Sequence, residues 1–263
     1  MKIDHGVQSL CTIAALAIWS GAADAPAATE VSPAHGIPRS AIRYDECLDL
    51  VRHHAAEAYD EATKWAGAGG GAAALHCEAL ALTELRRYPE AAQKLEDAAN
   101  AAPAMRAELL DQAGNAWLLA GDAAKAETAL SSALTLAPKD EDVLSDRARE
   151  RGTARNWTGA VEDLTAVLAV DPDRADIYVL RASALHAQGK PNEARADISR
   201  ALGIYPNYPE ALVERGAMRL ETGDRAGARA DWQEAAREAP GSSAGETARK
   251  RLAQLAALSQ RKK

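Results

Sequence analysis

Four prolines in the chain stand at a constant interval of 34 residues: Pro138, Pro172, Pro206 and Pro240. The same offset aligns further positions in the four segments that end at them. The eighth position of each segment is small: Gly114, Ala148, Ala182 and Gly216. The twentieth position is always alanine: Ala126, Ala160, Ala194 and Ala228. The position four residues after that alanine is bulky: Leu130, Leu164, Ile198 and Trp232. A fixed period of roughly 20 to 50 residues is typical of repeat architectures, so we expect an array of one structural unit.

The residue types at these positions indicate pairs of antiparallel helices. Small side chains at the eighth and twentieth positions allow two helices to approach closely, and the bulky side chain fills the space between them. Each proline lacks the amide hydrogen that a helix interior requires and therefore ends the second helix of its pair. The turn between the helices is predicted at Gly121, Gly189 and Gly223, with Arg155 at the same place in the remaining segment.

An earlier segment fits the same pattern when one extra residue is allowed near Met105. It supplies Ala79, Ala91, Leu95 and Pro103. Aromatic residues make up 4 % of the sequence and Phe is absent. A core built mainly of Ala and Leu favours closely packed helices, so the predicted fold is all-α.

Together these positions resemble the tetratricopeptide repeat over residues 72–242. The resemblance implies a right-handed α-solenoid of helix-turn-helix repeats with a C-terminal capping helix, about eleven or twelve helices in all. The predicted segments are a signal peptide over 1–23, a flexible linker over 24–40, a shortened first helix pair over 41–71, five repeats over 72–242, and a capping helix with a basic tail over 243–263.

The resemblance also implies a groove that binds a protein or peptide partner. In the family, positions two, five, nine, twelve and thirteen of each first helix line that groove. Here these positions hold Glu108, Asp111, Asn115, Leu118, Leu119, Asp142, Ser145, Arg149, Thr153, Asp176, Val179, Ser183, His186, Glu210, Val213, Ala217, Leu220 and Glu221. The alternative is that many of them are simply the polar side of a helix.

One ligand class is disfavoured at this groove. Family members that bind chaperones grip a carboxylate with paired Lys and Asn. Asn115 matches one such position, but Asp111 stands where the Lys is needed.

Charges at the seventh and twenty-third positions compensate in every repeat. The pairs are Glu78 with Lys94, Ala113 with Ala129, Arg147 with Asp163, Arg181 with Asp197, and Arg215 with Asp231. We therefore expect contacts between the first and second helix of a repeat rather than an arginine stripe that binds anions.

The amino terminus is typical of a cleaved export signal. Lys2 precedes the apolar run Leu10 to Trp19, and small residues follow, with a cut expected after Ala22 or Ala23. An uncleaved anchor is the alternative, but the run is shorter than the roughly 20 residues of a spanning helix. The mature protein is thus predicted to be periplasmic or secreted, without a membrane span.

Export would place Cys47 and Cys77 where a disulfide can form. A gapped alignment puts both at one position of adjacent first helices. Unbonded thiols, or a metal site with His53, His54 and His76, are the alternatives, but no CxxC or HxxxH spacing supports a metal.

Chemical motifs are otherwise missing from the sequence. Gly69, Gly70 and Gly71 lack the Lys and Ser/Thr of a phosphate loop, and no serine lies in a nucleophile elbow. We expect no catalysis, no cofactor and no metal.

Net charge is −7 for the chain and is unevenly spread. Residues 24–140 carry 18 acidic and 10 basic side chains, whereas residues 141–263 carry 19 and 20. This balance argues against nucleic acid as the main partner and is compatible with a basic partner segment, although solubility would explain it as well. Two functions remain: a scaffold that binds a partner in its groove, or a structural subunit of a cell-envelope complex that uses its convex face and ends.

Overall fold

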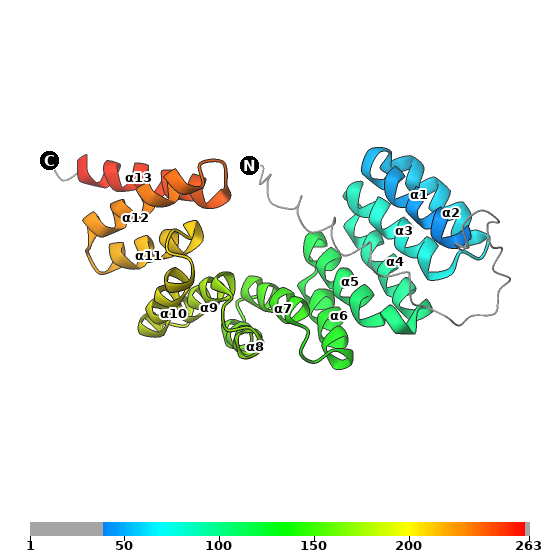
Figure 1. The fold of residues 1–263 in the computed structure, drawn as a ribbon, viewed down its shortest axis with the longest axis horizontal. Helices are drawn as coiled ribbons and strands as arrows, with labels where there is room; N and C mark the ends of the chain where they lie inside the picture. The colour runs from blue at the N-terminus through cyan, green and yellow to red at the C-terminus, as the bar shows by residue number, and fades with distance from the viewer. Residues whose placement is uncertain (1–38, 261–263) are drawn as a thin grey trace. The chain divides into compact units, whose positions relative to one another are not determined.

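The computed structural model describes residues 39–260, with side chains from residue 43 to residue 257. Within this range the chain is all-α, with thirteen α-helices, one short 3-10 turn and no strand. The helices are α1 Arg39–His53, α2 Ala55–Gly67, α3 Gly71–Glu84, α4 Tyr88–Ala101, α5 Arg106–Ala120, α6 Ala123–Leu136, α7 Glu141–Thr153, α8 Trp157–Val170, α9 Ala175–Ala187, α10 Pro191–Ile204, α11 Pro209–Glu221, α12 Arg225–Glu238 and α13 Ser243–Gln260, and the 3-10 turn is η2 Pro103–Met105 (Figure 1).

One expectation about the helices was wrong in detail, because the described residues hold thirteen α-helices rather than eleven or twelve. The first helix, α1, begins at Arg39, near the expected start at Ala41. The predicted signal peptide and residues 24–38 of the predicted linker lie outside the described residues.

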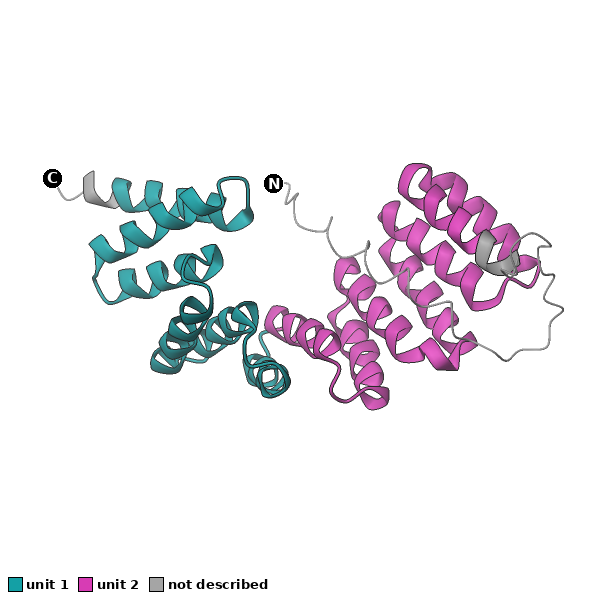
Figure 2. Ribbon diagram, in the orientation of Figure 1, with its two compact units in different colours: residues 1–10, 155–263 teal, residues 11–154 magenta. Residues whose placement is uncertain are grey.

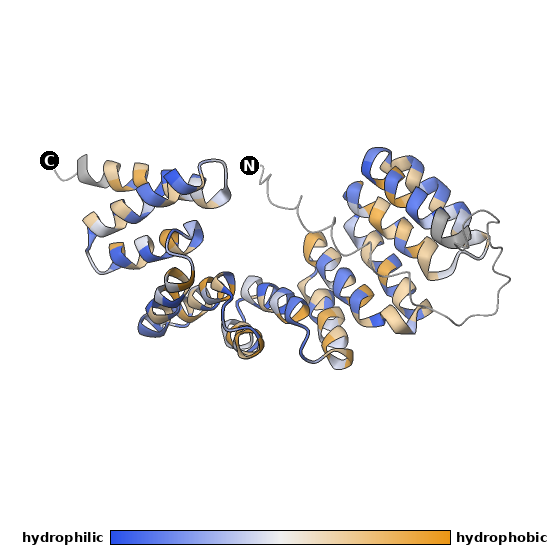
Figure 3. Cartoon of the chain, viewed as in Figure 1, coloured by the Kyte–Doolittle hydropathy of each residue, from blue (hydrophilic) through white to orange (hydrophobic). Residues whose placement is uncertain are grey.

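The helices divide into two compact units (Figure 2). The described part of the amino-terminal unit is residues 39–154, with α1 to α7, and that of the carboxy-terminal unit is residues 155–260, with α8 to α13. The division falls at the turn of the third full repeat, where Arg155 replaces the usual glycine. In each unit hydrophobic and hydrophilic residues alternate around the helices, as expected when one stripe of each helix is buried (Figure 3).

The positions that define the sequence period are buried. Ala79, Ala126, Ala182, Ala194 and Ala228 have no exposed surface, and the bulky side chains four residues after the twentieth position are at most 3 % exposed. The sequence analysis placed these residues in the core, and the structure confirms it.

Each period proline stands two residues after the end of a second helix. The residue before it lies outside the helical region of backbone conformation in all five cases: Ala102, Ala137, Asp171, Tyr205 and Ala239. A residue that precedes proline is sterically disfavoured in the helical region. The second helix therefore ends before the residue that precedes the proline, and not only before the proline itself.

The turns between paired helices use a left-handed residue. Gly121, Gly189 and Gly223 have φ values of 79°, 76° and 88°. Arg86 and Arg155 occupy the same place with φ values of 58° and 60°. The turn thus keeps its geometry where the sequence departs from glycine, at a conformational cost of about 1 kcal/mol for each arginine.

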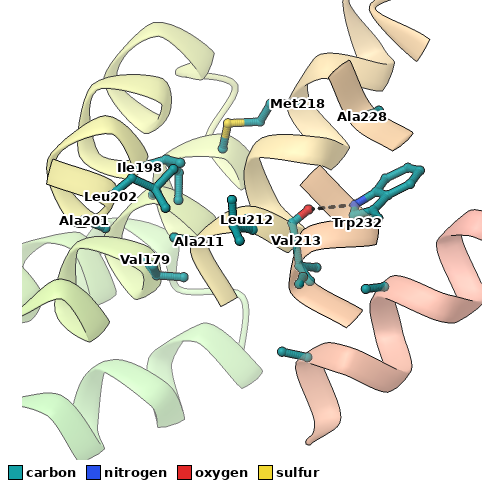
Figure 4. Packing of buried hydrophobic residues seen from close by; sticks show 14 of the residues in the cluster. Val179, Ile198, Ala201, Leu202, Ala211, Leu212, Val213, Met218, Ala228 and Trp232 are labelled. Carbon is teal, nitrogen blue, oxygen red and sulfur yellow. Dashed lines mark hydrogen bonds between the residues drawn. The ribbon is translucent and has the colours of Figure 1, made fainter. Parts of the chain in front are cut away.

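Helix pairs in the carboxy-terminal unit pack around Trp232 on α12 (Figure 4). The indole ring is 1 % exposed, and its Nε1 donates a hydrogen bond to the carbonyl oxygen of Val213, 3.1 Å away. A Cβ atom added to Gly216 would lie 2.5 Å from Nε1 of Trp232. The first helix can approach the second this closely only because Gly216 has no side chain.

The predicted charge pairs are present within both units. Lys94 contacts Glu78 in the amino-terminal unit. Arg181 donates two hydrogen bonds of 2.8 Å to Asp197, and Arg215 donates two of 2.8 and 3.1 Å to Asp231. Arg147 and Asp163 belong to different units, so their contact stays a prediction.

These pairs are more buried than surface ion pairs. The acidic partners Glu78, Asp197 and Asp231 are 1 %, 7 % and 4 % exposed. Arg181 also donates to the hydroxyl of Thr165 on the preceding α8, as Arg147 does to Ser131 on α6. Loss of one partner would leave a buried carboxylate without its cation, which costs more than loss of an exposed pair.

Cys47 on α1 and Cys77 on α3 are joined in the structure, with their Cα atoms 6.3 Å apart. This separation lies within the range that a disulfide requires. Both side chains are buried, beside Tyr44 and Trp65. Chemical formation of the bond in the mature protein stays a prediction.

The last helix, α13, packs on α11 and α12. It buries Ala244, Ala248 and Leu255, while Arg249 and Lys250 are exposed. Among the described helices, none has the length and apolar character to cross a membrane.

We predict that Arg181→Glu lowers the free energy of unfolding by about 1–3 kcal/mol, because it places two carboxylates together at a buried site. Adding Asp197→Lys should restore most of the loss, since Glu78 and Lys94 already use the reversed arrangement. Urea denaturation of the wild type, both single variants and the double variant measures the coupling. The exposed Arg200→Glu is the control and should change stability by less than about 0.5 kcal/mol. A double variant whose loss equals the sum of the single losses would exclude the contact.

Thiol counting in denaturant without reductant tests the Cys47–Cys77 bond. The mature monomer should show no free thiol until reductant is added, whereas a retained signal peptide would add the thiol of Cys11. The bond closes a sequence separation of 30 residues and should stabilise the amino-terminal unit by about 2–4 kcal/mol. Two free thiols in the mature protein would reject it.

Candidate functional site

The residues predicted to bind a partner lie on the first helices α5, α7, α9 and α11. Most are exposed or half-buried: Glu108, Asp111, Asn115, Leu118, Leu119, Asp142, Arg149, Thr153, Asp176, Ser183, His186, Glu210, Ala217, Leu220 and Glu221. Their availability to a partner is therefore compatible with the structure.

Three of the predicted residues are buried. Ser145, Val179 and Val213 are 3 %, 7 % and 9 % exposed. Val179 and Val213 belong to the core of the carboxy-terminal unit, and the hydroxyl of Ser145 donates to the carbonyl oxygen of Glu141 on its own helix. The expectation of partner contacts is corrected for these three side chains, because the fifth position of the first helix faces neighbouring helices.

Asp111 occupies this same fifth position on α5. Its carboxylate oxygen Oδ1 is buried and has no hydrogen-bond partner. Burial, first of all, and the nearby carboxylates of Asp146, Asp140, Asp142 and Glu108 together raise the pKa of Asp111 to about 8. Its carboxyl group therefore holds a proton at neutral pH.

Asn115 connects α5 to α7. Its side-chain amide donates a hydrogen bond to Asp146, which also contacts Arg149 on the next turn of α7. Asp140 caps the start of α7 and accepts hydrogen bonds from the backbone N–H groups of Asp142 and Val143. These contacts hold the acidic side chains of the two first helices together.

A buried polar network leads from α1 to this region. The hydroxyl of Tyr44 donates to Nδ1 of His76 at 2.6 Å, and Nε2–H of His76 donates to Oε1 of Gln112 at 2.8 Å. Burial lowers the pKa of His76, so the ring is neutral and can both accept and donate. The amide of Gln112 in turn bonds to Glu108, whose pKa is raised, chiefly by burial.

We define the α5/α7 acidic face as Glu108, Asp111, Asp140, Asp142 and Asp146. The sequence analysis proposed three of these residues but missed Asp140 and Asp146. Both lie within one turn of predicted positions, and the run of acids from 140 to 146 was the available indication. The network of Tyr44, His76 and Gln112 had no such indication, because no other repeat contains it.

The first helices of the carboxy-terminal unit present mixed charges instead. Nε2 of His186 on α9 contacts a carboxylate oxygen of Glu221 on α11 at 2.8 Å. Burial raises the pKa of Glu214, an effect that His186 and Arg251 oppose. Two predicted groove residues, His186 and Glu221, therefore bind each other.

A second pair of acids lies between α6 and α7. Glu150 is 3 % exposed, and burial together with the adjacent Glu127 raises its pKa to about 7. Arg151 donates to Glu127 at 2.8 Å and balances its charge. This cluster is internal to the helix interface.

The cysteines and histidines considered for a metal do not come together as ligands. The two thiols are joined, His76 is hydrogen-bonded to Tyr44 and Gln112, and His53 lies beside Asp49. Among the described residues, no group of three or more His, Cys, Asp and Glu side chains has an arrangement that could hold a metal ion.

Comparison with known proteins supports the repeat assignment. The tetratricopeptide-repeat family matches residues 145–209. None of the curated proteins matches the sequence.

Several solved structures share the fold. MamA from Desulfovibrio magneticus RS-1 is 20 % identical with a TM-score of 0.57, over 62 % of this chain and 92 % of that chain. A tetratricopeptide repeat protein from Parabacteroides merdae is 20 % identical with a TM-score of 0.59, over 82 % of this chain and 84 % of that chain. Another MamA structure is 16 % identical with a TM-score of 0.54, over 60 % and 91 % of the two chains.

The period of the sequence, the paired helices and the solved structures agree that the chain has the fold of tetratricopeptide-repeat proteins, and residues 145–209 match that family.

Proposed function

We propose that this protein is a non-catalytic scaffold that binds a peptide or protein through the first helices of its repeats, with α5 and α7 as the main contact. The observation that carries the proposal is the missing hydrogen-bond partner of one carboxyl oxygen of Asp111. Its carboxylate oxygen is buried without a partner beside exposed and half-buried polar residues of both helices. Proteins rarely leave a buried polar atom unsatisfied, and a bound partner would supply the missing contact.

The fold and its relatives support the general class of function. Tetratricopeptide repeats bind protein partners, and the described residues contain no metal-binding group. The predicted signal peptide would bring the scaffold to the periplasm or the cell exterior, which makes the envelope fraction the place to search for the partner.

The alternative is a structural subunit that binds its complex through its convex face and ends. It predicts that changes on the first helices leave partner binding unchanged. In a pull-down from the envelope fraction, Asp111→Ala with Asn115→Ala should reduce partner capture at least tenfold. The matched control is Gln93→Ala with Asp97→Ala, which likewise removes one side-chain amide and one carboxylate, here from the exposed side of the second helix α4.

Circular dichroism checks that both variants are folded. Equal capture by the wild type and the α5 variant, with loss only in the α4 variant, would contradict the groove proposal and favour the alternative.

A further inference from the structure

The fifth position of the first helix shows how unusual Asp111 is. Five consecutive repeats place His76, Asp111, Ser145, Val179 and Val213 there, and four of these are less than 10 % exposed. Val179 and Val213 are apolar, and the polar atoms of His76 and Ser145 have hydrogen-bond partners. Only Asp111 brings a carboxyl oxygen to this position without a partner.

Donors near Asp111 are already engaged elsewhere. The amide of Asn115 donates to Asp146, and that of Gln112 bonds to Glu108 while its oxygen accepts from His76. Arg149 is held by Asp146 on its own helix. None of these side chains donates a hydrogen bond to Oδ1 of Asp111 in the structure.

Charge restricts what that donor can be. The α5/α7 acidic face brings five carboxyl groups together, and Arg149 is the cation that contacts them. An anionic group would be repelled, and a neutral donor would leave the charges of Asp140, Asp142 and Asp146 uncompensated. A divalent ion is disfavoured, because the described residues contain no group with ligand geometry.

We infer that the α5/α7 acidic face binds a cationic side chain of the partner, a lysine ammonium or an arginine guanidinium, placed against Oδ1 of Asp111. This inference rests on the proposed function and specifies its ligand as a basic peptide segment. Each such group provides several N–H donors on one positive charge, which suits a half-buried carboxylate surrounded by other carboxylates.

Binding of the cation is coupled to a proton. Without ligand, burial and the four neighbouring carboxylates hold the pKa of Asp111 at about 8, so the carboxyl is protonated at pH 7. From α3, the neutral His76 reaches this region only through Gln112. The incoming cation favours the ionised form and must release the proton. Below pH 7, affinity should therefore increase about tenfold for each unit by which the pH is raised. Above pH 8, where the carboxyl is already ionised, affinity should become independent of pH.

Calorimetric titration of the full mature chain with blocked hexalysine and hexaarginine peptides tests this site. Blocked hexaglutamate serves as the charge-reversed probe. Measurements at pH 7 in two buffers of different ionisation enthalpy give the number of protons released. The wild type should release close to one proton per bound basic peptide and should not bind hexaglutamate.

Asp111→Asn is nearly isosteric with the protonated acid, so the fold should persist. It should abolish the proton release and the pH dependence, and weaken basic-peptide binding about tenfold at pH 8.5. Asp97→Asn on α4 removes the same charge from an exposed position and should behave as the wild type. Equal proton release from the wild type and Asp111→Asn would overturn the site.

The outcomes separate this inference from the proposed function. If the basic peptides do not bind, but the α5 variant still loses the natural partner, the scaffold function stands and the cationic site is wrong. If Asp111→Asn alters peptide binding as expected, but partner capture does not depend on α5, the cationic site stands and the proposed function fails.

Discussion

Close approach of the two helices in each repeat is the contact on which the other features depend. A Cβ atom on Gly114 would lie 2.5 Å from Cγ of Leu130, and one on Gly216 would lie 2.5 Å from Nε1 of Trp232. Real side chains do not overlap in this way, so in these two repeats the helix separation requires a glycine on one helix opposite a large side chain on the other.

This separation places the remaining contacts. It brings the seventh position of the first helix to the twenty-third position of the second, where Glu78, Asp197 and Asp231 are buried against their cationic partners. It also directs the fifth position toward neighbouring helices, which buries valine in two repeats and one carboxyl oxygen of the half-buried Asp111. The candidate site thus arises where a polar residue occupies a position that the repeat geometry buries.

Features that recur with the period could be predicted from the sequence, and features of a single repeat could not. The small and bulky positions, the proline ends and the charge pairs each occur several times, so their agreement reveals them. The network of Tyr44, His76 and Gln112 occurs once, and nothing in a 34-residue pattern indicates it. The burial of Asp111 was missed for a related reason. Family positions identify residues that face a groove, but the depth of each side chain depends on its neighbours.

The requirement for a small residue opposite a large one is tested most directly by changing the sizes of Gly216 and Trp232, singly and together. Gly216→Ala should lower the free energy of unfolding by about 1–3 kcal/mol through overpacking. Gly203→Ala, where an added Cβ has no neighbour within 4 Å, should be neutral or stabilise by up to about 1 kcal/mol. In a Trp232→Ile background, which recreates the Ala182 and Ile198 pairing of the preceding repeat, Gly216→Ala should no longer destabilise. An equal loss from Gly216→Ala in both backgrounds would contradict the account.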